Sequence, residues 1–450
     1  MPAVPTTRAR MTVGLLLCVL AVAFENMAVL TAMPAAAADL GDRELYAWAF
    51  TAIMLPQLVA IAVAGRWCDT RGPLRPFAVG LALCIVGIVV AAESAAMGVL
   101  LVGRAVQGFG GGFVNLTLMV TTGRLYAPAE RARVMTWFSA CWMLPSFLGP
   151  AAAAWLVEHL TWHWVFWAVL PFFVVGATFV LPGLRGLDAP EADAAANHVP
   201  VLAALAVALG ATLIQAAGQT LAWTSVPLAL AGGALLAGWL RRLMPRGFSP
   251  AGPGMSSTVV TRLVMAGSFF GLQAFLPLML VERGASYGDT GLAIAVSSAG
   301  WMLGSWVQSQ RWLTLSRDRI IALGAACVAA GLGVAGLGAW LPAVGMGLPV
   351  AGFTVAGLGM GLATASTSLV VKQLSQPAEL GRNTSSLQTG EMLGNALLAG
   401  LAGTLFASLS PLRRPEVAYG AIGVAMTVTA VVGVLVALRI GHVENASARR

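Results

Sequence analysis

Fourteen apolar segments, each long enough to cross a lipid bilayer, constrain the fold of this 450-residue chain more than any other feature. A run of about 20 apolar residues spans the hydrocarbon core as a helix, because a helix satisfies its backbone hydrogen bonds within the segment. The segments cover residues 12–34, 46–66, 76–94, 98–122, 133–156, 163–183, 199–218, 224–241, 258–281, 289–310, 319–340, 346–371, 384–409 and 417–438. We therefore predict an all-α polytopic membrane protein with fourteen spans, or with twelve if two of the shorter segments, 199–218 and 224–241, do not cross.

The composition supports a membrane protein and assigns a side to its loops. Charged residues make up 10% of the chain, against roughly 25% in a soluble domain. With a cytoplasmic N-terminus, all but five of the 26 Lys and Arg residues fall on the inner side, as the positive-inside rule requires. We therefore expect a multi-pass protein of the cell membrane with both termini in the cytoplasm, and no nucleic-acid partner. The five cysteines lack metal-ligand spacing, and no ATP-binding or hydrolytic motif is present, so we expect no metal site and no enzyme.

The segment 98–122 carries an arginine in its apolar interior. A charge at mid-span costs roughly 2.5–3.5 kcal/mol on insertion scales, so Arg104 should face a cavity or a counter-ion. Gln107, Gly111 and Asn115 share its helical face. The alternative is an arginine that only ties helices together.

A glutamate of the first segment lies at the same predicted depth. At about 1.5 Å per residue, Glu25 lies about 21 Å above Met11, which leaves roughly 9 Å of a 30 Å core to the outer face. Arg104 lies about 10 Å from that face, counted from Met97. We therefore predict a facing Glu25–Arg104 pair, which either couples protons to transport or is a passive buried salt bridge.

A polar stripe runs along the segment 384–409. Thr384, Gln388, Glu391 and Asn395 follow at spacings of four, three and four residues, which places them on one helical face. This pattern favours a helix that lines an aqueous pathway, where Glu391 would take part in proton coupling or attract cationic substrates. The alternative is a glutamate with a structural hydrogen-bonding role.

Two glycine triplets suggest an internal repeat. Gly108, Gly110 and Gly112 recur 249 residues later as Gly357, Gly359 and Gly361, each set followed by small polar residues. A duplicated helix bundle is typical of transporters built from related halves. The alternative is that glycine-rich close packing simply recurs in membrane helices.

The connection between the second and third segments combines an acid, two glycines that we expect to form turns, and flanking arginines. The residues are Gly65, Asp69, Arg71, Gly72 and Arg75. This connection resembles the gate loop between helices 2 and 3 of the major facilitator superfamily (MFS). The series Arg-x-x-Gln-Gly-x-Gly that starts at Arg104 is similar to the helix 4 signature of the same superfamily.

The fifth segment carries Gly149-Pro150, which resembles the helix 5 signature of drug exporters. Ala153-Ala154 stands where that signature has a glycine pair, so export is less firmly indicated than the superfamily. The chain as a whole resembles the fourteen-helix drug/proton antiporter branch, although Glu25 stands where such exporters often carry aspartate.

This resemblance implies two six-helix bundles with two helices inserted between them. The implied parts are a cytoplasmic N-terminus (1–11), the first bundle (12–183), a linker with two extra helices (184–257), the second bundle (258–438) and a cytoplasmic tail (439–450). It further implies that Glu25, Arg104 and Glu391 couple protons and that Asp69 holds the inner gate shut. A substrate cavity is implied at Met27, Gln57, Gln107, Asn115, Trp142, Gln273, Trp301, Gln388 and Asn395, with packing as the alternative role of Trp301.

The function expected from the resemblance is secondary active efflux of small hydrophobic or cationic compounds by alternating access. The proton gradient would be the energy source, with no cofactor, and the protein would be a monomer in the bilayer. The alternatives are an exporter of lipid or metabolite, or a proton-coupled importer, of the same fold. A membrane receptor or integral-membrane enzyme is a further alternative, which lacks a soluble domain or a catalytic cluster to support it.

Overall fold

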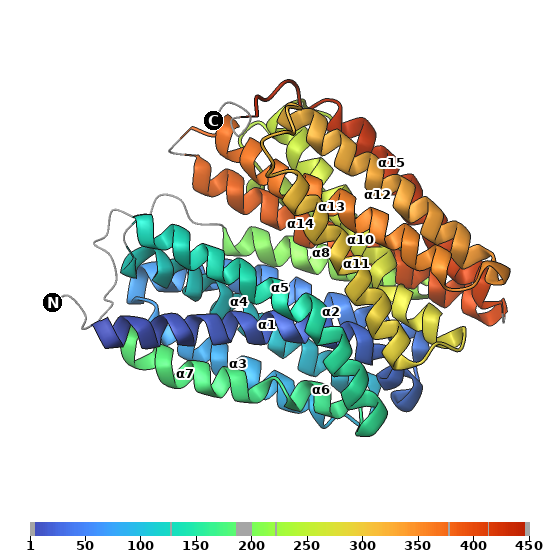
Figure 1. Cartoon of the computed structure of the whole chain (residues 1–450), viewed down its shortest axis with the longest axis horizontal. Helices are drawn as coiled ribbons and strands as arrows, with labels where there is room; N and C mark the ends of the chain where they lie inside the picture. Colours follow the sequence, from blue (N-terminus) through green and yellow to red (C-terminus); the bar gives the residue numbers. More distant parts are fainter. Residues whose placement is uncertain are drawn as a thin grey trace. The chain divides into compact units, whose positions relative to one another are not determined.

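The computed structural model describes residues 5–126, 128–185, 200–220, 223–376, 379–412 and 414–445, and this part of the chain is helical without a strand (Figure 1). The helices are α1 (Pro5–Leu40), α2 (Trp48–Arg71), α3 (Leu74–Ala92), α4 (Met97–Leu125), α5 (Pro128–His159), α6 (His163–Trp167), α7 (Leu170–Leu184), α8 (Val201–Thr220), α9 (Val226–Leu243), α10 (Met255–Glu282), α11 (Tyr287–Val307), α12 (Arg317–Trp340), α13 (Gly347–Leu374), α14 (Leu380–Leu409) and α15 (Pro415–Ala437). Short 3-10 turns are η1 (Arg43–Leu45), η3 (Trp223–Ser225), η4 (Pro342–Val344) and η5 (Ser410–Leu412).

Fourteen membrane-length spans occur in the described residues, which confirms the predicted number. The two short segments form the helices α8 and α9, and both are long and apolar enough to cross, which favours fourteen spans over twelve. The short helix α6 and the helix α7 together make one span, His163–Leu184. Their junction lies just before Pro171, whose ring nitrogen cannot donate the hydrogen bond that a continuous helix would need.

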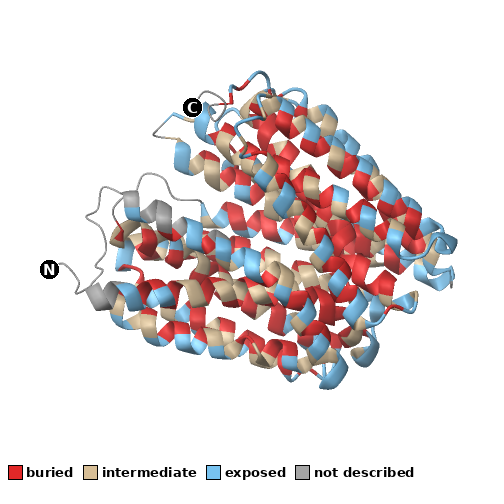
Figure 2. Ribbon diagram, viewed as in Figure 1, coloured by how far each residue is buried: buried red, intermediate tan, exposed pale blue. Residues whose placement is uncertain are grey.

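The chain forms two compact units. Unit 1 comprises residues 1–42 and 52–205, and unit 2 comprises residues 43–51 and 206–450. The division into two bundles and an inserted pair stays a prediction, and most of the predicted linker around residues 186–199 lies outside the described residues. Within each unit, buried residues line the helix faces that meet one another, whereas exposed residues lie on the outer faces (Figure 2).

The glycine triplet of α4 sets how closely helices approach in unit 1. A Cβ atom added to Gly108 or Gly112 would collide with the backbone of α2, near Ile53 and Gln57. A Cβ atom on Gly110 would collide with α3 at Gly80 and Cys84 instead. Alternate glycines therefore let α4 pack against α2 on one side and α3 on the other.

Unit 2 repeats this arrangement with equivalent residues. Gly357 and Gly361 of α13 lie against α11, and Gly359 lies against α12 at Gly324 and Val328. The offset is 249 residues for the triplets and 244 residues from Gly80 to Gly324. The middle glycine of each triplet, Gly110 or Gly359, meets a glycine of the neighbouring helix, Gly80 or Gly324. These equivalent contacts confirm the predicted internal repeat, and the repeat preserves the close packing of the glycines.

Candidate functional site

A buried ion pair joins α1 to α4 in unit 1. Arg104 Nη1 donates to Glu25 Oε1 and, at 3.2 Å, to Gln107 Oε1. The side chains of Arg104 and Glu25 are 3% and 4% exposed. The pairing predicted from their depths is therefore confirmed, whereas its part in proton coupling stays a prediction.

Close backbone packing fixes the segment of α4 that carries this arginine. Gly103 lies against α3 at Gly87 and Ala91, and Gly108 lies against α2. Gly87 of α3 in turn faces Gln107, and a Cβ atom at position 87 would collide with the backbone of α4. Helix α4 is thus held on both sides of Arg104, so the guanidinium has little freedom to follow Glu25 if α1 moves.

The helix 5 signature lies against the helix that carries Glu25. Gly149 and Pro150 both lie inside α5, and a Cβ atom on Gly149 would lie 3.1 Å from the Cβ atom of Met27 on α1. Pro150 has no N–H group, which leaves the carbonyl of Ser146 without its helical donor. The signature therefore removes one helical hydrogen bond and brings α5 close to α1 two residues beyond Glu25.

The predicted gate loop is mostly helix, which corrects the expectation of two turn-forming glycines. Gly65 lies inside α2, which continues to Arg71, and α3 begins at Leu74. Gly72 alone has a left-handed backbone, with φ of 73°, which a side chain rarely adopts. The stretch resembles a loop in sequence because charged residues occupy the last turns of α2 and the first turn of α3.

Asp69 pairs with a residue that sequence reasoning did not select. Its Oδ1 atom lies 3.8 Å from Nη2 of Arg124, near the C-terminal end of α4, and the same guanidinium donates to the carbonyl of Cys68 at 3.5 Å. Arg71 and Arg75, which were predicted beside Asp69, are exposed. Asp69 therefore links α2 to α4. The sequence could have indicated this contact only by the position of Arg124, a basic residue at the cytoplasmic end predicted for the segment 98–122.

A second ion pair lies in unit 2 and joins three helices. Arg262 of α10 donates from Nη2 to Glu391 Oε2 of α14 at 2.9 Å. Its Nη1 atom donates to the carbonyl of Thr364 and to Thr367 Oγ1 on α13, at 2.6 and 2.8 Å. The sequence does not single out Arg262, because it lies near the cytoplasmic end of the segment 258–281, where the positive-inside rule expects basic residues. Glu391 therefore has a cationic partner that the polar stripe did not indicate.

The other members of the stripe differ in their surroundings. Gln388 is exposed, Thr384 is half-buried and Asn395 is buried. The Oδ1 atom of Asn395 has no hydrogen-bond partner in the described part of the chain. A helix that lined a water-filled pathway would account for such an atom, because water would supply the donor.

The predicted cavity residues are divided between the two units. Met27, Gln57, Gln107, Asn115 and Trp142 belong to unit 1, whereas Gln273, Trp301, Gln388 and Asn395 belong to unit 2. Trp301 meets Phe269 edge to face with ring centroids 5.5 Å apart, which favours the packing role. A shared substrate cavity stays a prediction. Groups of three or more potential metal ligands are absent from the described residues.

Comparison with known proteins places this geometry in one family. A sequence model of the Major Facilitator Superfamily matches residues 15–354. The multidrug transporter protein MdtP of Bacillus subtilis (strain 168) is 30% identical over 179 residues, 40% of this chain and 33% of that protein. The multidrug resistance protein B homolog of Mycobacterium tuberculosis (strain CDC 1551 / Oshkosh) is 28% identical over 351 residues, 72% of this chain and 64% of that protein. The chain thus matches about a third of the first relative's length and less than two thirds of the second's.

Solved structures share the architecture. The crystal structure of an auto inhibited POT family peptide transporter superposes with a TM-score of 0.68, over 97% of this chain and 98% of that chain. The two sequences are 16% identical, so this likeness shows the fold alone.

Proposed function

The chain belongs to the Major Facilitator Superfamily, and we propose that it exports small hydrophobic or cationic compounds by proton-driven alternating access. It is a multi-pass membrane protein of a transporter family, with fourteen helices of membrane length. The names of its relatives support multidrug export as the substrate class. The observation that carries the proposal is the buried Glu25–Arg104 pair, because an intramembrane acid that can bind a proton is what coupling requires.

Protonation of Glu25 would change the contact between α1 and α4. The carboxylate attracts the guanidinium strongly where water is excluded, and a neutral carboxyl group does not. Arg104 would keep Gln107 Oε1 as an acceptor when that attraction is lost. The same helices therefore have two arrangements, with and without the Glu25 contact, and the proton would shift the population between them.

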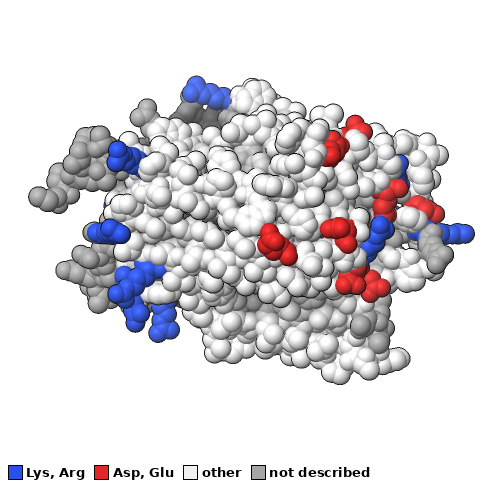
Figure 3. Space-filling model, turned by 90° about the horizontal axis from the view of Figure 1, so that it is seen from below, with Lys and Arg blue, Asp and Glu red and all other residues white. Residues whose placement is uncertain are grey.

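The proposed orientation in the membrane rests on the charge distribution. On the face seen in Figure 3, the Asp and Glu side chains lie in one half, and the end away from them carries Lys and Arg side chains, while further Lys and Arg side chains lie among the acids. The positive-inside rule then supports cytoplasmic termini in the cell membrane, with the Asp69–Arg124 contact on the inner side as part of the gate. We further propose that the protein works as a monomer, with the proton gradient as its energy source.

The substitution Glu25→Gln tests the coupling. Glutamine fills the same volume and cannot titrate, so gradient-driven transport of a cationic dye into inside-out vesicles should fall at least tenfold, about 1.4 kcal/mol or more in the rate. Dye exchange without a gradient should persist, because exchange needs no net proton movement. The matched control is Glu158→Gln, which neutralises an exposed acid at the end of α5 and should transport at the wild-type rate.

Wild-type transport by Glu25→Gln would show that the ion pair is a passive salt bridge. Gradient-driven movement of substrate in the opposite direction would instead support the proton-coupled importer. A panel of growth inhibitors applied to cells that overproduce the protein would identify the substrates, and unchanged susceptibility to all of them would favour lipid or metabolite export.

A further inference from the structure

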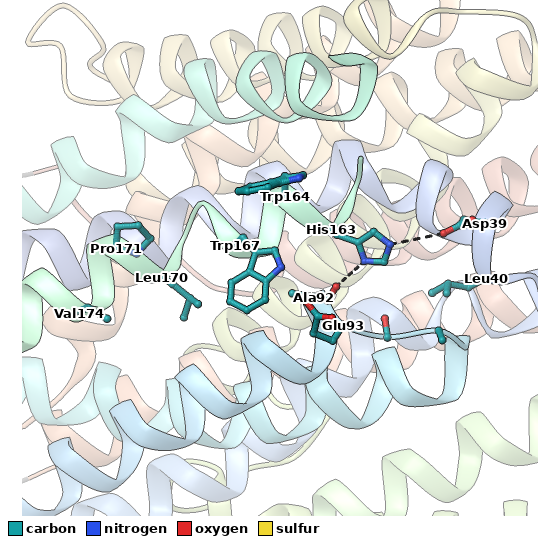
Figure 4. A pocket seen from close by; sticks show the side chains of 12 residues that line it. Asp39, Leu40, Ala92, Glu93, His163, Trp164, Trp167, Leu170, Pro171 and Val174 are labelled. Atoms are coloured by element: carbon teal, nitrogen blue, oxygen red, sulfur yellow. Dashed lines mark hydrogen bonds and ion pairs between the residues drawn. The ribbon is translucent and has the colours of Figure 1, made fainter. Parts of the chain in front are cut away.

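A hollow of about 1010 Å³ lies in unit 1 where α1 ends, α3 meets α4 and α6 begins (Figure 4). The proposed transport mechanism gives it no role. Its lining combines acidic, aromatic and apolar side chains: Asp39, Leu40, Ala92, Glu93, Ser94, Ala95, His163, Trp164, Trp167, Leu170, Pro171 and Val174. These classes occupy different parts of the hollow, which therefore has a polar end and an apolar end.

The polar end is built by hydrogen bonds from three elements. Asp39 Oδ2 accepts from Trp162 Nε1 at 2.9 Å. His163 Nδ1 lies 2.6 Å from the carbonyl oxygen of Ala92, which can only accept, so Nδ1 carries the proton. His163 Nε2 lies 3.9 Å from Asp39 Oδ2. Glu93 completes this end from the C-terminus of α3, and its side chain is exposed.

Two indole rings separate the polar end from the apolar end. Trp164 and Trp167 lie between His163 on one side and Leu170 on the other (Figure 4). An aromatic face attracts a cation within about 6 Å of its centroid and also tolerates an alkyl chain. Pro171 and Val174 continue the lining along the exposed side of α7, in the direction of the membrane interior.

We propose that this hollow binds an organic ammonium group that carries an apolar tail. Two carboxylates meet the positive charge, the tryptophans flank it, and the tail lies along α7. The described lining residues include neither lysine nor arginine, and His163 directs its protonated Nδ1 to the carbonyl of Ala92, so the charges that face the hollow are the two carboxylates. The ammonium can come from an aminophospholipid headgroup or from a free amphiphilic cation. The proposal concerns binding and does not depend on the transport mechanism.

Equilibrium binding of radiolabelled decyltrimethylammonium to the full chain in maltoside micelles tests this site. The double variant Asp39→Asn/Glu93→Gln should bind about tenfold more weakly, because both charges are lost while the acceptor for Trp162 is kept. Trp167→Ala should weaken binding about threefold to tenfold. Decanol, which has the same tail without the charge, should bind the wild type and the double variant equally.

The matched controls are Glu158→Gln and Trp155→Ala, which remove an exposed acid and an exposed indole of α5 outside the hollow. Both should bind the label as the wild type does. Absence of wild-type binding, unchanged binding by the pocket variants, or equal weakening by the controls would overturn the proposal.

Added phosphatidylethanolamine separates the two sources of the ammonium. Displacement of the label from the wild type, with no effect on the residual binding of the double variant, would identify the lipid headgroup as the occupant. Label that stays bound in the presence of this lipid, and remains sensitive to the pocket substitutions, would identify a free amphiphilic cation.

Discussion

The two units place opposite chemistry at equivalent positions of the internal repeat. Arg104 of α4 and Phe353 of α13 are separated by 249 residues, the offset that relates the two glycine triplets. Arg104 pairs with Glu25 of α1. Phe353 instead stacks on Phe269 of α10, with ring centroids 4.5 Å apart. Helix α1 therefore meets the glycine-bearing helix α4 through an ion pair in unit 1, whereas α10 meets α13 through aromatic rings in unit 2.

This difference indicates that the fold does not require an ion pair at this position. An aromatic stack buries its surface at no electrostatic cost, and unit 2 shows that the position can be filled that way. A buried ion pair rarely repays the desolvation of its two charges. Retention of the costlier pair in unit 1 therefore favours a functional role for Glu25 and Arg104.

The ion pair of unit 2 differs from that of unit 1 in exposure and in its number of partners. The side chains of Arg262 and Glu391 are 9% and 24% exposed, so solvent reaches this pair more easily. Arg262 also donates to α13, and it keeps two acceptors if Glu391 is changed. We therefore expect the pair in unit 2 to tolerate substitution better than the pair in unit 1.

The largest effect should come from removing one partner of the buried pair. Arg104→Met leaves the Glu25 carboxylate without its cation and should lower the free energy of unfolding by about 3–5 kcal/mol. The double variant Glu25→Met/Arg104→Met makes this position apolar, as unit 2 does, and should regain most of that loss. Reversible unfolding in mixed micelles measures both, and a double variant as unstable as the single one would contradict the comparison between the units.

A smaller effect should test the shared scaffold. Gly110→Ala and Gly359→Ala each push a methyl group into a neighbouring backbone at equivalent positions and should each cost about 1–3 kcal/mol. Gly111→Ala is the matched control, because a Cβ atom there has no neighbour within 4 Å and alanine favours the helix. Thermal unfolding measures the stability of the three variants. If the losses for Gly110→Ala and Gly359→Ala differed as much from each other as from the loss for Gly111→Ala, the two positions would not be equivalent.

The smallest effect should follow Glu391→Gln. Glutamine can still accept from Arg262, and the site is partly exposed, so the cost in stability should be about 1 kcal/mol or less. Because the substitution leaves the charge of Arg262 uncompensated, export of cationic compounds should fall by about twofold or less, and export of neutral compounds should not change. A loss of cationic export of roughly tenfold or more, measured in vesicles, would restore the interpretation of Glu391 as a recognition residue.

The sequence by itself predicted fourteen spans, the repeat and the Glu25–Arg104 pair. Each of these features can be counted in residues along the chain, as the length of an apolar segment, the spacing of glycines or the depth of a charge from a helix end. Depth sufficed for Glu25 and Arg104 because each charge is rare within its span, so few partners compete.

Only the tertiary structure decided which side chains meet across helices. Arg262 reaches both α13 and α14, and Asp69 reaches Arg124, because of how each helix is rotated about its axis and how closely glycines let its neighbours approach. The lining of the hollow in unit 1 likewise comes from α1, the connection from α3 to α4, and α6 with α7, segments far apart in the chain. Hydropathy carries no information on helix rotation or crossing, so these contacts could not be predicted from the order of residues.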